Sequence, residues 1–268
     1  MLANRLAASG GRRIPESALA LDYCLAWFLV GLSHTGLCRR VAFKGGTALK
    51  RCYFSDYRFS EDLDFTLIEP MPLAEILRTL EPVYAFVRDA TGIQFAFERA
   101  DRRAHANSYT FHLSCIGPLP AARSLKVDVT LRELLVFPLE DRPVLRGYHE
   151  FEDLPDDRIV QTYSLAEIAS EKAVALIDRA RNEPRDLYDL WYLTARERLD
   201  LGSVVPAIHA KLAFRNKPAK GLQEAILRKE ARLKALWGVR LADQMVALPP
   251  FEEVFRELRR TLRQADLP

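Results

Sequence analysis

The sequence predicts an α+β protein, in which a mixed sheet flanked by helices is followed by a helical domain. Up to about residue 150, stretches with strand periodicity alternate with helical stretches, as expected where helices pack on a sheet. After Ser164 the pattern is helical almost throughout. With 49% hydrophobic and 28% charged residues, the composition is that of an ordinary soluble protein. We therefore expect two domains, residues 1–155 and 156–268.

The predicted elements before residue 150 follow one another closely. The first helix is mainly apolar and starts near Pro15, a residue favoured in the first turn of a helix. Asp22 interrupts its apolar run, which argues against a signal peptide and a membrane span. The expected order is a helix at 15–35, an extended run at 41–43, a helix opened by Thr47 at 47–54, a strand at 62–67, a helix at 71–91, and strands at 93–99, 108–115 and 124–132.

Glycine, proline and the alternation of apolar and polar residues support two of these predicted elements. The helix that begins near Met71 should stop at Gly92, and Pro82 either kinks it or marks its true start. The stretch 124–132 alternates between two faces, with Leu125, Val127, Val129 and Leu131 on one and Lys126, Asp128, Thr130 and Arg132 on the other.

Charge and cysteines give weaker information. The formal net charge is +3, but residues 211–234 hold eight Lys or Arg against two Glu. This segment is either a site for a polyanion such as RNA or a solvated helix face. The four cysteines have no C-x-x-C spacing, so we expect reduced, buried thiols and no zinc site: Cys24, Cys38, Cys52 and Cys115.

Residues 44–67 carry most of the chemical information. On a strand, Asp62 and Asp64 point to one face and lie about 7 Å apart. Two such carboxylates repel each other, so a cation should sit between them, and a hard divalent ion is the usual one. Gly45 and Gly46 stand just before a predicted helix, where bare N–H groups suit a phosphate. Taken singly, the Gly-Gly pair could be an ordinary turn, and the two aspartates could lie on a solvated strand face. Together, the two features indicate nucleotidyl transfer.

Asp128 is the candidate third carboxylate, because it lies on the polar face of its own strand. If the two strands are neighbours, three carboxylates converge and could hold two metal ions. The third acid would then act as a base or orient the nucleophile. The alternative for Asp128 is a solvated strand residue.

Two further candidates lie in the helical half. Lys172 is four residues from both Ile168 and Leu176, on or beside an apolar stripe, so it either extends its ammonium to water or meets phosphate charge. Glu167 and Glu171 could pair with Lys172 or with a nearby Arg. Asp186 and Asp189 share another helix face, although Asp186 also suits the first turn after Pro184.

These segments resemble a known family. Phe43, Gly45-Gly46, Arg58-Phe59-Ser60 and Asp62-x-Asp64 resemble the first motifs of the AbiEii/AbiGii-type nucleotidyltransferase toxins, of the DNA polymerase β-like superfamily. Glu167–Leu176 and Arg185–Leu190 are similar to the third and fourth, so the resemblance spans about residues 40–195. It implies a nucleotidyltransferase domain, a helical domain that completes the nucleotide site and could bind RNA, an NTP substrate, Mg²⁺ or Mn²⁺, an RNA acceptor such as tRNA 3′ ends, a cognate antitoxin, and a cytoplasmic location without a membrane.

The motifs and the resemblance together assign the site. We expect the metal at Asp62, Asp64 and Asp128, and catalytic roles for these three with Lys172 and Asp186. We expect nucleotide contacts from Lys44, Gly45, Gly46, Thr47, Ser60, Lys172, Arg185 and Asp189. Ser60 is either a turn serine or a regulatory phosphorylation site at the mouth of the metal site. A small-molecule or protein acceptor and a non-catalytic binding module are the alternative functions.

Overall fold

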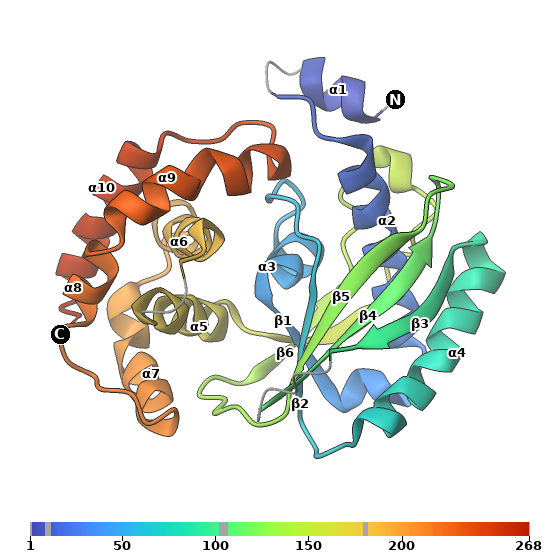
Figure 1. The fold of residues 1–268 in the computed structure, drawn as a ribbon, viewed down its shortest axis with the longest axis horizontal. Coiled ribbons are helices and arrows are strands. Elements are labelled where there is room, and N and C mark those ends of the chain that lie inside the picture. Colours follow the sequence, from blue (N-terminus) through green and yellow to red (C-terminus); the bar gives the residue numbers. More distant parts are fainter. Residues whose placement is uncertain (1, 9–11, 102–106, 179–181, 268) are drawn as a thin grey trace. The chain divides into compact units, whose positions relative to one another are not determined.

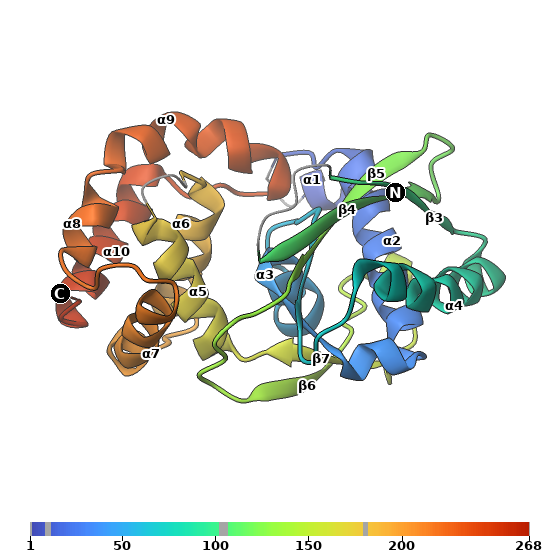
Figure 2. The same cartoon turned by 60° about the horizontal axis from the view of Figure 1, so that its bottom comes forward.

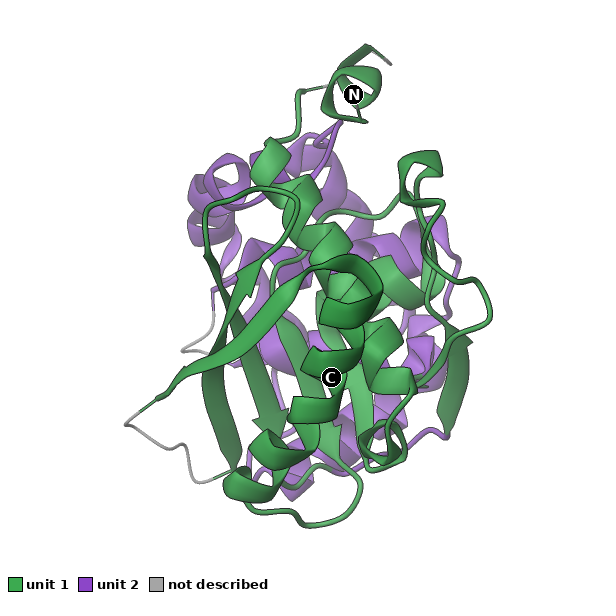
Figure 3. Cartoon of the chain, turned by 90° about the vertical axis from the view of Figure 1, so that its right-hand side faces the viewer, with its two compact units in different colours: residues 1–133, 139–163 green, residues 134–138, 164–268 purple. Residues whose placement is uncertain are grey.

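The structure is a computed structural model that describes residues 2–8, 12–101, 107–178 and 182–267. It forms two compact units (Figure 3). Unit 1 comprises Met1–Glu133 and Leu139–Tyr163, and unit 2 comprises Leu134–Pro138 and Ser164–Pro268. The division after Tyr163 lies eight residues beyond the expected domain boundary, because the last strand of the sheet ends there.

Unit 1 is built on a seven-stranded mixed sheet with the order β3-β4-β5-β2-β1-β7-β6 (Figure 1). β2 pairs parallel with β5, β1 pairs parallel with β7, and the other neighbours are antiparallel. The strands are β1 (Val41–Lys44), β2 (Leu63–Leu67), β3 (Gln94–Ala100), β4 (Ser108–Ile116), β5 (Arg123–Thr130), β6 (Leu139–Pro143) and β7 (Ile159–Tyr163). The α+β prediction is confirmed, and so are the strands expected near β1 to β5.

β6 and β7 were not predicted. β6 reads Leu-Glu-Asp-Arg-Pro and lies at the edge of the sheet, where charges and proline are tolerated. Its composition therefore does not predict a strand. It is a strand because it pairs with β7.

Two long helices, α2 (Glu16–Ser33) and α4 (Leu73–Thr91), cover one face of the sheet (Figure 1). Gly31 of α2 lies against α4, where an added Cβ would come within 2.7 Å of the Val87 side chain. Apolar residues of both helices close over the buried strand face that includes Phe65 and Val127. α2 is long and apolar enough to cross a membrane, but 72% of it is buried within the structure, as befits a core helix.

The helix boundaries agree closely with the sequence. α4 runs through Pro82 without ending, so Pro82 does not mark its start, and Gly92 caps it with a left-handed φ of 78°. The helix expected at 47–54 instead begins at Gly45, as α3 (Gly45–Ala48), and continues as a π-helical turn, Leu49–Tyr53. The shorter elements of unit 1 are α1 (Leu2–Ala8) and the 3₁₀ turns Gly36–Arg39 and His149–Phe151.

The π-helical turn carries two buried cations. Arg51 forms an ion pair with Asp22 of α2 at 2.6 Å, and neither side chain is more than 1% exposed. Lys50 donates to the carbonyl of Ser55 at 2.5 Å and to the hydroxyl of Tyr148 at 2.8 Å. Burial lowers the pKa of Lys50 to about 8, with opposing contributions from nearby charges. The four cysteines are free and buried, as expected.

Unit 2 is helical in the part that the structure describes (Figure 2). Ser164 caps its first helix by accepting a hydrogen bond from the Glu167 N–H, and Asp200 caps α7 in the same way. Trp237, Phe251 and Tyr188 pack together in its core. The helices are α5 (Leu165–Ile177), α6 (Pro184–Trp191), the π-helical turn Tyr192–Arg196, α7 (Leu201–Phe214), α8 (Leu222–Leu227), α9 (Glu230–Leu241), the 3₁₀ turn Ala242–Gln244 and α10 (Phe251–Gln264).

Candidate active site

The sheet register brings two of the predicted carboxylates together. β2 and β5 are parallel neighbours, and Asp64 lies directly opposite Asp128. Asp62 precedes β2 by one residue. Leu63 and Phe65 point into the core, with exposures of 0% and 5%, so the aspartates lie on the opposite, half-buried face. The alternation therefore predicted this face correctly, and the two strands are neighbours.

Lys126 is a cation that lies beside these carboxylates. Its ammonium donates to Asp128 Oδ2 at 2.5 Å, while Thr110 donates to Asp128 Oδ1 at 2.5 Å. Burial by itself would lower the pKa of Lys126, but the hydrogen bond and charge of Asp128, with the charges of Asp62 and Asp64, raise it. Sequence reasoning missed this residue, although Lys126 shares a strand face with Asp128 two positions away.

The carboxylates offer the oxygen ligands that Mg²⁺ and Mn²⁺ prefer. Within the described ranges, however, no three His, Cys, Asp or Glu side chains are already gathered as a metal-binding group. Asp128 is engaged by Lys126 and Thr110. The donor chemistry of these carboxylates fits a hard divalent ion.

The two glycines allow close side-chain approaches. Gly45 has φ +80°, and an added Cβ would lie 2.4 Å from Asp64 Oδ2. At Gly46, a Cβ would lie 2.5 Å from Arg58 Nη2 and 3.1 Å from Ser60 Oγ. Side chains at these positions would push against the carboxylate and the guanidinium. Gly45 in addition has a left-handed φ that residues with a side chain rarely adopt.

The other residues expected near the nucleotide have differing environments. Lys44 donates to Thr130 Oγ1 at 3.0 Å and lies opposite Asp64 in the register. Thr47 is fully buried and donates to the carbonyl of Asp62 at 2.5 Å, which ties α3 to the start of β2. The Thr47 hydroxyl therefore anchors the backbone that carries Asp62.

Ser60 is only 6% exposed and lies against Gly46. The sequence had suggested that its hydroxyl lies at the mouth of the site. Because it is covered, a kinase could reach this hydroxyl only after local opening of the segment, which favours the structural interpretation of Ser60.

In unit 2, Lys172 of α5 lies between two carboxylates of α6. Its ammonium is 2.9 Å from Asp186 Oδ1 and 2.7 Å from Asp189 Oδ2. The side chains are 11%, 2% and 0% exposed, so Lys172 does not extend to water. Both aspartates bind the same ammonium, whereas neighbouring Arg185 lies 3.7 Å from Glu183 Oε2.

The glutamates of α5 bind a different lysine. Lys211, fully buried in α7, lies 2.6 Å from Glu167 Oε1 and 3.2 Å from Glu171 Oε1, and Arg215 lies 2.9 Å from the same Glu171 oxygen. Glu167 also accepts from the N–H groups of Val136 and Phe137. The expected pairing with an Arg is therefore present for Glu171, and Glu167 holds segment 134–138 onto unit 2.

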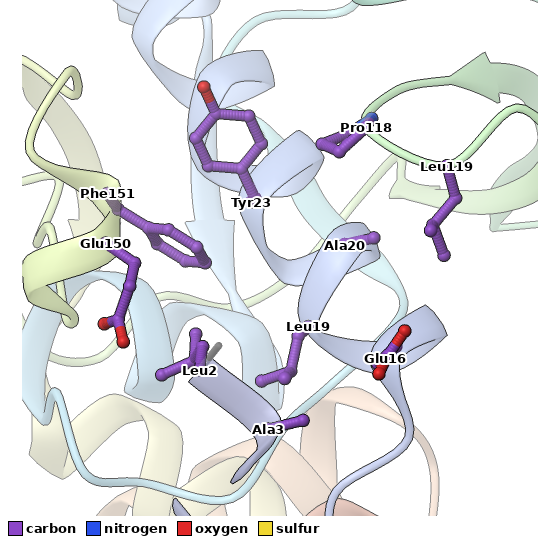
Figure 4. Close-up of a pocket in the computed structure, with 10 residues that line it drawn as sticks. All are labelled: Leu2, Ala3, Glu16, Leu19, Ala20, Tyr23, Pro118, Leu119, Glu150 and Phe151. Atoms are coloured by element: carbon purple, nitrogen blue, oxygen red, sulfur yellow. The ribbon is translucent and has the colours of Figure 1, made fainter. Parts of the chain in front are cut away.

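A cavity of about 380 Å³ lies elsewhere in unit 1 (Figure 4). Leu2, Leu19, Tyr23 and Phe151 line it, with the carboxylate of Glu150 also pointing toward it. Its described lining contains none of the predicted catalytic residues. The largely apolar wall does not suit a triphosphate.

A mixed sheet that presents carboxylates beside a Gly-Gly turn fits the nucleotidyl transfer that the sequence predicts. The family model of the nucleotidyl transferase AbiEii toxin of type IV toxin–antitoxin systems matches residues 27–257. The chain belongs to this family, and it is a nucleotidyltransferase toxin of a toxin–antitoxin system.

A solved structure shares the fold. The chain is similar to MenT4, a nucleotidyltransferase toxin from Mycobacterium tuberculosis H37Rv, with a TM-score of 0.62 and 19% sequence identity. The similarity covers 92% of this chain and 82% of MenT4. A comparison with curated proteins found no significant match.

Proposed function

We propose that this toxin transfers a nucleoside monophosphate from an NTP to the 3′ end of a tRNA, using Mg²⁺ or Mn²⁺, in the cytoplasm and under the control of a cognate antitoxin. The observation that supports the reaction is the pairing of Asp64 with Asp128 beside Gly45. The acceptor rests on the family resemblance and on the basic residues of unit 2. Transfer of this kind joins an acceptor hydroxyl to the α-phosphorus and releases pyrophosphate.

The chain's own groups have distinct roles in this proposal. Asp62 and Asp64 would hold the ion, which when bound neutralises phosphate charge and activates the attacking hydroxyl. The N–H groups of Gly45 and Gly46, at the start of α3, would donate hydrogen bonds to phosphate oxygens. Asp128 would orient the acceptor hydroxyl and take its proton, because an ionised carboxylate keeps lone pairs beyond the two that accept from Lys126 and Thr110.

Lys172, Asp186 and Asp189 keep their predicted part in the nucleotide site. The buried ion pairs support a positioning role for Lys172, which fixes α6 against α5. A contact between Lys172 and the triphosphate would form in addition to the ion pairs of Lys172 with Asp186 and Asp189.

The acceptor class is tested by incubating the chain with each α-labelled NTP, Mg²⁺ and separate pools of total tRNA, total protein and small metabolites. We expect label in tRNA, removable by trimming its 3′ end. If label enters only protein or small molecules, the protein is still a nucleotidyltransferase, but its acceptor is not RNA.

A further inference from the structure

The basic segment 211–234 does not form one continuous cationic face. Five of its eight cations are held within unit 2: Lys211 and Arg215 by glutamates of α5, Lys217 and Lys229 by Asp178, and Lys234 by Glu252. In the ranges that the structure describes, no ion pair or hydrogen bond is formed by the side chains of Lys220, Arg228 and Arg232. We therefore no longer expect all eight cations of the segment to contact RNA.

Two of these three cations share a pocket. A cavity of about 470 Å³ lies between the end of α5, the loop before α8, and α8 itself. Lys217, Lys220 and Arg228 line it. Asp178, a carboxylate of the lining, is already bonded to Lys217. Glu224 lies nearby, beside Gly221, and is exposed. The pocket therefore keeps an excess of positive charge.

The remaining wall of the pocket is apolar. Ile177 and Leu222 are 8% and 1% exposed, and Pro218 and Ala225 complete this side. A cavity of a few hundred Å³ is the size of a small-ligand site, well above the space that one inorganic anion needs. A lining that combines cations with apolar groups suits a phosphodiester unit with its attached sugar. Arg228 can offer a planar pair of donors to phosphate oxygens, and Lys220 a mobile point charge.

We propose that this pocket binds a phosphodiester segment of the RNA acceptor. This inference rests on the proposed function, because it takes the acceptor to be RNA. It adds that recognition here is through the backbone, since the described lining contains no aromatic side chain on which a base could stack.

The test compares two double variants with equal loss of charge. Lys220→Ala/Arg228→Ala removes the two pocket cations, and Arg232→Ala/Arg240→Ala removes two exposed arginines of α9 outside the pocket. Affinity for a labelled tRNA is measured by fluorescence anisotropy over a series of NaCl concentrations. NTP affinity is measured by calorimetry.

We expect the pocket variant to bind the tRNA about tenfold more weakly and to lower the salt slope by about 0.7 per lost contact, while the control variant changes much less. NTP affinity should be the same in all three proteins. Equal RNA affinity of the two variants would overturn the inference, as would an NTP affinity lowered only in the pocket variant. Failure of the proposed function looks different: no RNA pool is labelled by the unaltered chain.

Discussion

At the scale of single residues, Lys126 contributes to the charge balance of the site. Three carboxylates would repel one another on this sheet face, and the ammonium of Lys126 offsets part of that repulsion. The ammonium of Lys126 bonds Asp128, while Asp62 and Asp64 act on it as nearby charges. Its positive charge also opposes the entry of a metal ion at Asp62 and Asp64.

Lys126→Met should therefore strengthen metal binding. Removal of the ammonium removes a positive charge that opposes the ion, and a half-exposed charge interaction of this kind contributes about 1 kcal/mol, or roughly fivefold in affinity. Mn²⁺ titration followed by electron paramagnetic resonance measures the change. Thr110→Val, which removes a neutral donor to the same carboxylate, is the matched control. Weaker Mn²⁺ binding by Lys126→Met would contradict this charge balance.

Gly45→Ala should damage both fold and site. The residue has φ +80°, and its new Cβ would meet Asp64 Oδ2 at 2.4 Å. We expect a loss of about 1–3 kcal/mol in unfolding free energy and the loss of NTP binding. Gly238→Ala is the control, because it lies inside α9 with nothing within 4 Å and should gain up to about 1 kcal/mol. Urea denaturation compares them, and two variants of equal stability would count against the argument.

Lys50 should give a pH-dependent stability of known sign. Its folded pKa of about 8 lies below the usual lysine value of 10.5, so the unfolded chain binds more protons between these values. Lys50 therefore makes stability rise as the pH rises from about 8 to 10.5. The unfolding free energy of the unaltered chain, taken relative to Lys50→Met, should increase over this window. A flat difference would show that Lys50 titrates normally.

At the scale of elements, the sequence predicted the half of the site that depends on local alternation. The strand that carries Asp64 and the one that carries Asp128 both alternate, so their polar faces could be predicted. The meeting of Lys126 with three carboxylates depends on pairing between strands over sixty residues apart, which local periodicity does not contain. β6 was missed because its charges and proline mask an edge strand, and the ion pairs of the basic segment were missed because their partners are distant in sequence.

Lys172→Met should destabilise unit 2 through α5 and α6. The substitution leaves the buried carboxylates of Asp186 and Asp189 without their shared cation, at a cost of about 3–5 kcal/mol. Thermal and urea unfolding measure this loss. Lys172→Met/Asp186→Asn/Asp189→Asn, which removes the stranded charges, should recover much of it. If Lys172→Met unfolds like the parent protein but binds NTP more weakly, the residue acts on the nucleotide and not on the helix pair.

At the scale of the whole molecule, the chemistry divides between the units. Unit 1 contains the carboxylates and the Gly-Gly turn, and unit 2 contains the Lys172 group and the basic pocket. The membership of residues 27–257 in one toxin family covers both units, so the family's activity belongs to the chain and not to one part of it.

The most direct test of the central claim is nucleotidyl transfer by Asp62→Asn and Asp64→Asn, measured with labelled NTP and tRNA at saturating Mg²⁺. Asparagine keeps the shape of each side chain and removes its charge, so circular dichroism and thermal melting should match the unaltered protein. We predict that transfer falls by at least a hundredfold in both variants. Transfer at the original rate by either folded variant would show that the reaction does not depend on these carboxylates.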